Sequence, residues 1–181
     1  MNKDLESVII IPVLEAESIV KKWRERYDRV ALLGIPAHIT LLYPFKTPSE
    51  IKEKIADKLQ LFFQTVNSFA FSLTTIGTFP NVIFLTPSPK NPFIELTKKL
   101  AKLFPENPPY GGKFPEVNPH LTIGQFSKED NFKRTLSVIS ENINPKLPQE
   151  ARATEARLMV ENINGKWTTL RKFPLVRNCL V

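Results

Sequence analysis

The chain has 181 residues, of which 42% are hydrophobic, and 25 Lys and Arg against 18 Asp and Glu give a formal net charge of +7. This composition is sufficient for one compact core, and no stretch approaches the roughly 20 apolar residues that would span a bilayer. The moderate positive charge favours a phosphate-bearing partner but does not identify one by itself.

The chain contains a single cysteine, Cys179, which excludes an internal disulfide and fits a reducing compartment. We interpret it as a structural thiol in a terminal strand. The first apolar run is short and follows Asp4 and Glu6, which is unlike a secretory signal. We therefore expect a cytoplasmic protein without membrane attachment.

The first elements alternate between apolar runs and a polar helix. Residues 8–14 predict a buried strand and residues 15–28 a polar helix anchored by Ile19, Val20 and Trp23. Residues 30–33 and 38–43 are typical of strands, interrupted by Gly34 and Pro36.

A helix is expected after the capping box at residues 47–50, where Thr, Pro, Ser and Glu follow one another. Its apolar face repeats every three or four residues, at Ile51, Ile55, Leu59 and Phe62. Residues 68–76 and 82–86 then predict two strands joined by a turn at 77–81.

A second helix is expected from the cap at Asn91 and Pro92, with Phe93, Leu96, Leu100 and Leu103 on one stripe. Residues 105–119 are rich in Pro and Gly and predict a long loop. The remaining pattern predicts a strand at 120–125, a helix near 131–142, and strands at 153–162 and 167–176, with the last hairpin turn at 162–165.

The chain has only two histidines, and both lie in the same short pattern, in "GIPAHITLLYPF" (residues 34–45) and in "NPHLTIGQF" (residues 118–126). In a strand, residues i and i+2 point to the same face. His38 and Thr40 therefore project together, and so do His120 and Thr122, while the apolar residues between them face a core. The two copies lie nearly half the chain apart, which predicts an α+β protein with two related lobes, each presenting one such strand.

Two imidazoles and two hydroxyls that converge can catalyse phosphodiester cleavage. With an unperturbed pKa near 6.5, one histidine can be neutral and the other protonated, as a general base and a general acid. The hydroxyls can donate hydrogen bonds to the non-bridging oxygens of a phosphate. The imidazolium and hydroxyls can offset the developing charge, so the chemistry requires no metal and no cofactor.

Simpler interpretations stand beside this one. A single histidine in a strand is more often packed or solvated than catalytic, but two copies with Thr at the same offset are poorly explained by chance. A zinc site is disfavoured because no Cys or carboxylate lies at ligand spacing from the histidines.

The motifs His38-Ile39-Thr40-Leu41 and His120-Leu121-Thr122-Ile123 resemble the signature of the 2H phosphoesterase superfamily, and "GIPAHITLLYPF" is similar to bacterial members called 2'-5' RNA ligases. The resemblance implies a single bilobal domain over residues 1–181, with two pseudo-symmetric antiparallel-sheet lobes, outer helices and a central groove. It implies metal-independent hydrolysis of 2',3'-cyclic phosphate or 2'-5' linkages of RNA ends or nucleotides. By this analogy, His38 protonates the leaving oxygen, His120 activates water, and Thr40 and Thr122 bind phosphate; the sequence leaves the exchange of the two histidine roles open.

Five further residues are candidates for substrate binding, each with a structural alternative: Phe45, Tyr43, Tyr110, Lys113 and Arg157. An aromatic ring after the first motif can stack on a base, and we favour Phe45, at the strand end, over Tyr43, which shares the parity of the buried residues. Tyr110 and Lys113 lie on the long loop, which can close over a ligand with Gly111 and Gly112 as hinges. Arg157 can bind phosphate from the polar face of its strand or form a salt bridge near Glu155.

Two other functions remain open at this point. One is a module that binds nucleotides or RNA ends with little catalysis, and the other is RNA ligation in the same groove. The moderate net charge disfavours ligation, which must align two RNA ends. We expect a monomer with an RNA terminus or a nucleotide cyclic phosphate as its partner.

Overall fold

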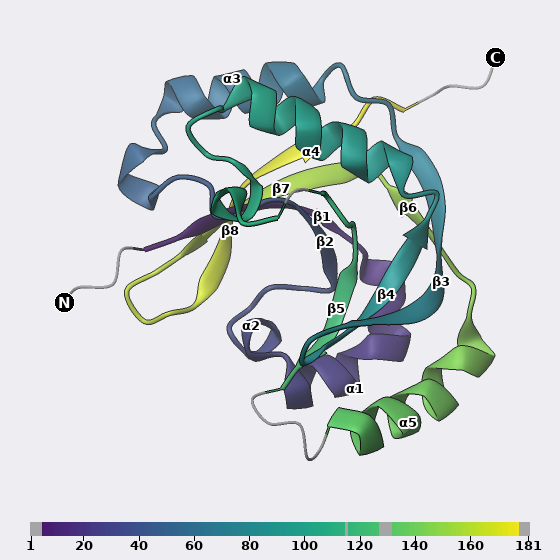
Figure 1. Cartoon of the computed structure of the whole chain (residues 1–181). Helices are drawn as coiled ribbons and strands as arrows, with labels where there is room; N and C mark the ends of the chain where they lie inside the picture. The colour runs from purple at the N-terminus through teal and green to yellow at the C-terminus, as the bar shows by residue number, and fades with distance from the viewer. Residues whose placement is uncertain (1–4, 115, 127–131, 178–181) are drawn as a thin grey trace.

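A computed structural model describes residues 5–114, 116–126 and 132–177. The strands form two four-stranded antiparallel sheets, with orders β2-β1-β7-β8 and β5-β4-β3-β6 (Figure 1). The strands are β1 (Ser7–Pro12), β2 (His38–Leu42), β3 (Phe69–Phe79), β4 (Val82–Ser88), β5 (Leu121–Gln125), β6 (Gln149–Ala153), β7 (Glu155–Glu161) and β8 (Trp167–Pro174).

Helices pack against both sheets. They are α1 (Glu17–Tyr27), α2 (Arg29–Leu32), α3 (Glu53–Phe63), α4 (Asn91–Leu103) and α5 (Phe132–Ile143). In Figure 1, α3 and α4 lie over the first sheet, and α1 and α5 lie beside the second. Each sheet therefore has helices packed beside it.

The two motif strands occupy equivalent places. β2 and β5 are each the edge strand of their sheet, and each follows a strand and a helix, as β1-α1-β2 and β4-α4-β5. Each of these two helices packs against the motif strand of the other sheet: α1 contacts β5, and α4 contacts β2. The predicted α+β fold with two related antiparallel sheets is confirmed.

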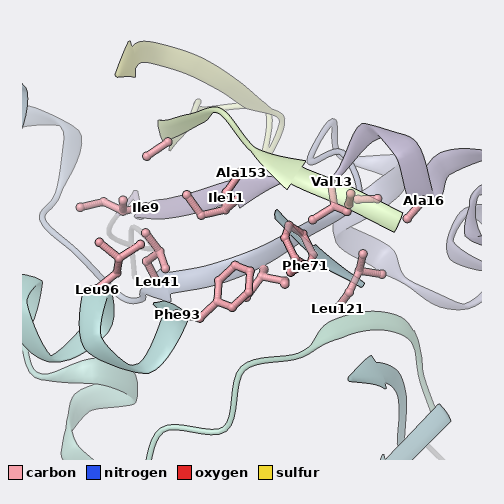
Figure 2. Packing of buried hydrophobic residues seen from close by; sticks show 14 of the residues in the cluster. Ile9, Ile11, Val13, Ala16, Leu41, Phe71, Phe93, Leu96, Leu121 and Ala153 are labelled. Atoms are coloured by element: carbon pink, nitrogen blue, oxygen red, sulfur yellow. The ribbon is translucent and has the colours of Figure 1, made fainter. Parts of the chain in front are cut away.

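A continuous apolar core joins the two sheets (Figure 2). Ile9 and Leu41 come from the first sheet, Phe71 and Leu121 from the second, and Phe93 from α4. The alternation expected for the motif strands is present, since the residues between His and Thr are fully buried in both copies. A second, smaller cluster packs on the opposite face of the first sheet and contains Val8, Ile10, Ile35, Met159 and Trp167.

A β-bulge follows the threonine of each motif. In the β1–β2 ladder, Thr40 pairs with Ile10 and Leu42 with Ile9, so Leu41 has no partner residue. In the β4–β5 ladder, Thr122 pairs with Phe84 and Gly124 with Ile83, so Ile123 is skipped in the same way. A bulge reverses the facing of every residue after it. The residues after the bulges therefore face opposite to their simple parity.

Several predicted elements were wrong in detail. The predicted strand at residues 30–33 is wrong: Arg29–Leu32 form helix α2 and Leu33 is its C-cap, because the Asp28 side chain caps the N-terminus by accepting from the Val30 N–H. The capping box at Thr47 starts only a 3₁₀ turn, and Ile51 leaves the helical conformation before α3 begins at Glu53.

The second sheet also differs from expectation. Strand β6 was not predicted, and β3 continues through Gly77 to a two-residue turn at Pro80 and Asn81. The interpretation of Cys179 falls outside the described residues. Among the helices that the structure describes, none is long and apolar enough to cross a membrane.

Candidate active site

A groove of about 420 Å³ opens where the two motif strands meet. β2 and β5 contact each other, and the groove contains the polar pairs of both motifs: His38 with Thr40, and His120 with Thr122. The other lining residues are Glu6, Val8, Asp28, Arg29, Val30, Leu33, Ile35, Tyr43, Tyr110, Gln125, Glu161 and Trp167. The two halves of the chain thus contribute one histidine and one threonine each to a shared cavity.

Both histidine rings are held by the same local hydrogen bond. His38 Nδ1 lies 2.8 Å from the carbonyl oxygen of Pro36, and His120 Nδ1 lies 2.8 Å from that of Asn118. A carbonyl oxygen only accepts, so the neutral rings carry their hydrogen on Nδ1. Nε2 of each ring is then the nitrogen that can take up a proton or, once charged, deliver one.

Burial keeps both rings neutral in the ligand-free groove. Desolvation is the main reason that the pKa of His38 falls to about 3, and the nearby positive charge of Arg24 and that of His120 lower it further. Desolvation also lowers the pKa of His120, with a smaller contribution from Lys90. The hydrogen bonds to Pro36 and Asn118 act in the opposite direction because they favour the charged ring.

Two tyrosines complete the groove on the side of β2. Burial raises the pKa of Tyr110, and its hydrogen bond with Thr40 opposes that rise. The Tyr43 hydroxyl donates to Glu6 at 2.8 Å, and burial together with Glu6 raises the Tyr43 pKa to about 12. Both phenols stay protonated near neutral pH and can donate hydrogen bonds.

A family model described as the 2'-5' RNA ligase superfamily matches residues 12–164, which include both motif strands, all strands of the second sheet, and β2 and β7 of the first. The chain belongs to the 2'-5' RNA ligase superfamily. This superfamily is the one that the two motifs resemble, so the resemblance is confirmed.

Two bacterial relatives match this superfamily member over almost the whole length of both chains. The chain is 26% identical over 170 residues to a Geobacillus kaustophilus protein named "Putative phosphoesterase", covering 92% of this chain and 93% of the other. It is 28% identical over 176 residues to a Bacillus anthracis protein of the same name, covering 93% and 95%.

Solved structures share the fold at lower identity. E. coli LigT complexed with 3'-AMP matches with a TM-score of 0.63 and 17% identity, over 96% of this chain and 99% of LigT. The Thermus thermophilus protein TT0787 matches with a TM-score of 0.62 and 16% identity, over the same shares of the two chains. The fold of this chain is therefore shared with these solved structures.

Three of the five residues predicted to bind substrate do not line the groove. Phe45 is 4% exposed and packs edge-on against Phe104 in the main core, so its placement at the groove mouth was wrong. Lys113 is exposed and does not line the groove. Arg157 shares a sheet face with Ile10 but forms an ion pair with Glu155 at 2.6 Å, which is the salt-bridge alternative.

Tyr43 and Tyr110 do line the groove. Simple parity favoured core packing for Tyr43, but the bulge at Leu41 turns it to the face of His38 and Thr40. The bulge at Ile123 brings Gln125 into the groove in the same way, and this residue was missed. The equivalent offset of Tyr43 and Gln125 from the two histidines was the sequence signal that could have identified both.

Other groove residues carried no local signal. Glu6, just before β1, lies beside Glu161 at the end of β7, whose N–H donates to the Glu6 carbonyl at 2.9 Å. Trp167 approaches because Gly34, at φ 106°, lets the Trp167 carbonyl pass within 2.7 Å of where a Cβ would lie. Asp28 is the last residue of the predicted helix at 15–28, and Arg29 lies between that helix and the predicted strand at 30–33. Among the described residues, no group of three or more His, Cys, Asp and Glu side chains is arranged to hold a metal ion.

Proposed function

We propose that this chain is a metal-independent phosphodiesterase that hydrolyses 2',3'-cyclic phosphates, or 2'-5' linkages, of RNA ends or nucleotides. The observation that carries the proposal is the pair of histidines in one groove, each oriented by the same Nδ1 hydrogen bond. This arrangement supplies two matched proton-transfer groups to one cavity, one from each motif.

The proposed reaction is an in-line displacement at phosphorus. One neutral histidine takes a proton from water through Nε2, and the water oxygen forms the new bond to phosphorus. The bond from phosphorus to a ribose oxygen breaks, and the other histidine, as imidazolium, gives its proton to that oxygen. The products are a phosphomonoester and a free ribose hydroxyl, and the two histidines exchange protonation states.

Substrate binding supplies the charge that the ligand-free groove lacks. Burial holds both histidine pKa values below the usual range, whereas a phosphate anion beside the rings favours their charged form. Thr40 and Thr122 share the groove with the rings and can donate to the non-bridging oxygens. The bound phosphate therefore favours formation of the imidazolium that protonates its leaving ribose oxygen.

The resemblance assigns the acid to His38 and the base to His120. The two rings have the same hydrogen-bond arrangement, which is compatible with either order. Tyr43 and Trp167 offer aromatic surface in the same groove, on which a nucleobase can stack.

The proposal is tested by incubating the purified chain with 2',3'-cyclic AMP, CMP, GMP and UMP and with RNA oligomers carrying cyclic ends, in the presence of EDTA. We expect turnover with a bell-shaped dependence on pH. His38→Ala and His120→Ala should each lower kcat by about 10³-fold or more, and the double variant little further, because the two groups act as a unit.

Leu61→Ala is the matched control, because this side chain is 67% exposed on α3 and lies outside the groove lining. It should leave turnover unchanged. Near-full activity of either histidine variant would exclude the acid–base mechanism. Saturable nucleotide binding without product over hours would favour the binding module instead.

A further inference from the structure

We propose that Glu17 and Arg24, on one face of α1, are positioning residues for His38, because they hold the backbone whose carbonyl fixes the tautomer of its ring. Neither residue lines the groove. The catalytic part of this inference rests on the proposed function, whereas the tautomer can be measured without any substrate.

The two side chains bind the peptide groups on both sides of Pro36. The Glu17 carboxylate accepts a hydrogen bond from the Ala37 N–H at 2.7 Å, and the Arg24 guanidinium donates to the Ile35 carbonyl at 3.3 Å. Pro36, between them, provides the carbonyl that accepts from His38 Nδ1. Glu17 and Arg24 are seven residues apart, which places them two turns apart on the same side of the helix.

Arg24 is itself fixed by a buried ion pair. Its Nε and terminal nitrogen donate to Asp28 Oδ2 at 3.1 and 2.9 Å, and both residues are 2% exposed. Asp28 Oδ1 accepts from the Val30 N–H, and the Val30 carbonyl accepts from the Ile35 N–H at 3.0 Å. These bonds close a ring from α1 to the turn before β2, so the guanidinium meets the Ile35 carbonyl from a fixed direction.

The second histidine has a different support. The Asn118 side chain, next to the carbonyl that holds His120, accepts from Lys90 at 3.0 Å in an exposed setting. The His120 ring instead packs against Phe79 and Phe84, with ring centroids 5.1 and 5.2 Å away. Aromatic packing constrains the position of the ring but not which nitrogen carries the hydrogen. The carboxylate and guanidinium support is therefore specific to His38.

The expected consequence is catalytic rather than a loss of substrate binding. If the Pro36 carbonyl moves, His38 loses the acceptor that keeps its hydrogen on Nδ1, and Nε2 no longer presents a defined lone pair to the groove. Substrate contacts in the groove stay the same because Glu17 makes none of them. The variant should then lose kcat while KM is retained.

Three variants separate this role from a merely structural one. Glu17→Ala removes the acceptor for the Ala37 N–H, and Glu17→Gln keeps an acceptor oxygen of the same reach. Glu15→Ala is the matched control, because Glu15 also accepts from a backbone N–H, at 3.2 Å, but from Arg152 on β6. Glu17→Met, of similar length without an acceptor, replaces the alanine variant if that protein does not fold.

The first measurement is ¹⁵N NMR of the imidazole nitrogens in the free protein, which has only two histidines to assign. We expect an Nδ1–H tautomer for His38 in the parent, Glu17→Gln and Glu15→Ala proteins, and a tautomer mixture in Glu17→Ala. The second is steady-state turnover of the best cyclic nucleotide, where Glu17→Ala should lower kcat about 10-fold with KM changed less than about twofold.

An unchanged His38 tautomer in Glu17→Ala would overturn the inference, and so would an equal loss of kcat in Glu15→Ala or no recovery in Glu17→Gln. If the parent protein turns over no substrate, the proposed function fails while the NMR result still decides the positioning role. The two failures are therefore distinguishable.

Discussion

Each groove histidine donates Nδ1–H to the carbonyl of the residue two places before it, and each motif has a proline at or beside that residue. In the first motif the acceptor is Pro36, and in the second it is Asn118, which precedes Pro119. The bond is local, so the acceptor of each ring belongs to the segment that leads into its own motif strand. For His38, hydrogen bonds from Glu17 and Arg24 on α1 also hold the peptide groups of that segment.

The burial of these rings predicts an acid-sensitive fold. Both histidines have pKa values below the usual 6.5 in the folded protein, His38 at about 3, whereas the unfolded chain titrates near 6.5. Between pH 6.5 and pH 5 the unfolded state therefore binds more protons, and the free energy of unfolding falls as pH falls. The slope should reach up to about 1.4 kcal/mol per pH unit for His38, and His120 should add to it in the same direction.

Urea denaturation at pH 7, 6 and 5 and constant ionic strength measures this slope. His38→Gln and His120→Gln should each remove one histidine's share, because glutamine does not titrate. A free energy of unfolding that stays flat from pH 7 to pH 5 in the parent protein would contradict the burial of both rings.

At the scale of the element, helix α1 connects the two motif strands. One of its faces holds the turn before β2 through Glu17 and Arg24, and its C-terminal end packs against β5. The contact with β5 is close: a Cβ on Gly124 would lie 2.7 Å from the Cβ of Tyr27. The position of β5, and with it Thr122, depends on glycine at this point.

Gly124→Ala should therefore lower the free energy of unfolding by about 1–3 kcal/mol, because the added methyl group forces α1 and β5 apart. Thermal or urea unfolding measures the change. Gln125→Ala, at the next and exposed position of the same strand, should change stability by less than about 0.5 kcal/mol. Equal stability of Gly124→Ala and the parent would mean that the helix–strand contact is looser than described.

The sequence predicts best those features that depend on residues close together in the chain. The alternation around His38 and His120 was sufficient to predict the two motif strands and the faces of their polar pairs, since i and i+2 share a face. The alternation within each strand did not predict the bulges, because an extra residue in a strand leaves no mark on its own pattern. Tyr43 was therefore assigned to the wrong face and Gln125 was missed. Only the equal offset of these two residues from the two histidines carried a signal.

Two other differences have tertiary causes. Phe45 was expected in the groove, but the main core offers its ring an edge-on partner in Phe104, far along the chain. Residues 30–33 are apolar enough for a strand, yet the Asp28 cap and the Arg24 ion pair favour a short helix. In both cases a partner outside the local window decided the outcome.

At the scale of the whole molecule, the sheets share one core. Leu41 from the first sheet and Leu85 from the second belong to the same buried cluster, together with residues of α1, α3, α4 and α5. Neither sheet can lose its packing without exposing the other. The two-lobed architecture should therefore behave as one cooperative unit.

Scanning calorimetry tests this expectation. A single transition with equal calorimetric and van't Hoff enthalpies is expected, and Leu41→Ala and Leu85→Ala should each shift the whole transition through a loss of about 2–5 kcal/mol. Ile163→Ala, at a side chain that is 88% exposed in the last hairpin, should leave it in place. Two separate transitions would show that the sheets unfold independently.

The bulge after each threonine has a consequence for how this groove can diversify. Because the facing of the chain reverses at Leu41 and Ile123, each motif segment turns a histidine and a threonine into the groove and, after the bulge, a further side chain, Tyr43 or Gln125. Under the proposed function, the groups that react and the groups that contact the rest of the substrate lie in separate stretches of the same short segment. We then expect substitutions at positions 43 and 125 to change which molecule is accepted, while the histidines, the threonines and their hydrogen bonds are retained.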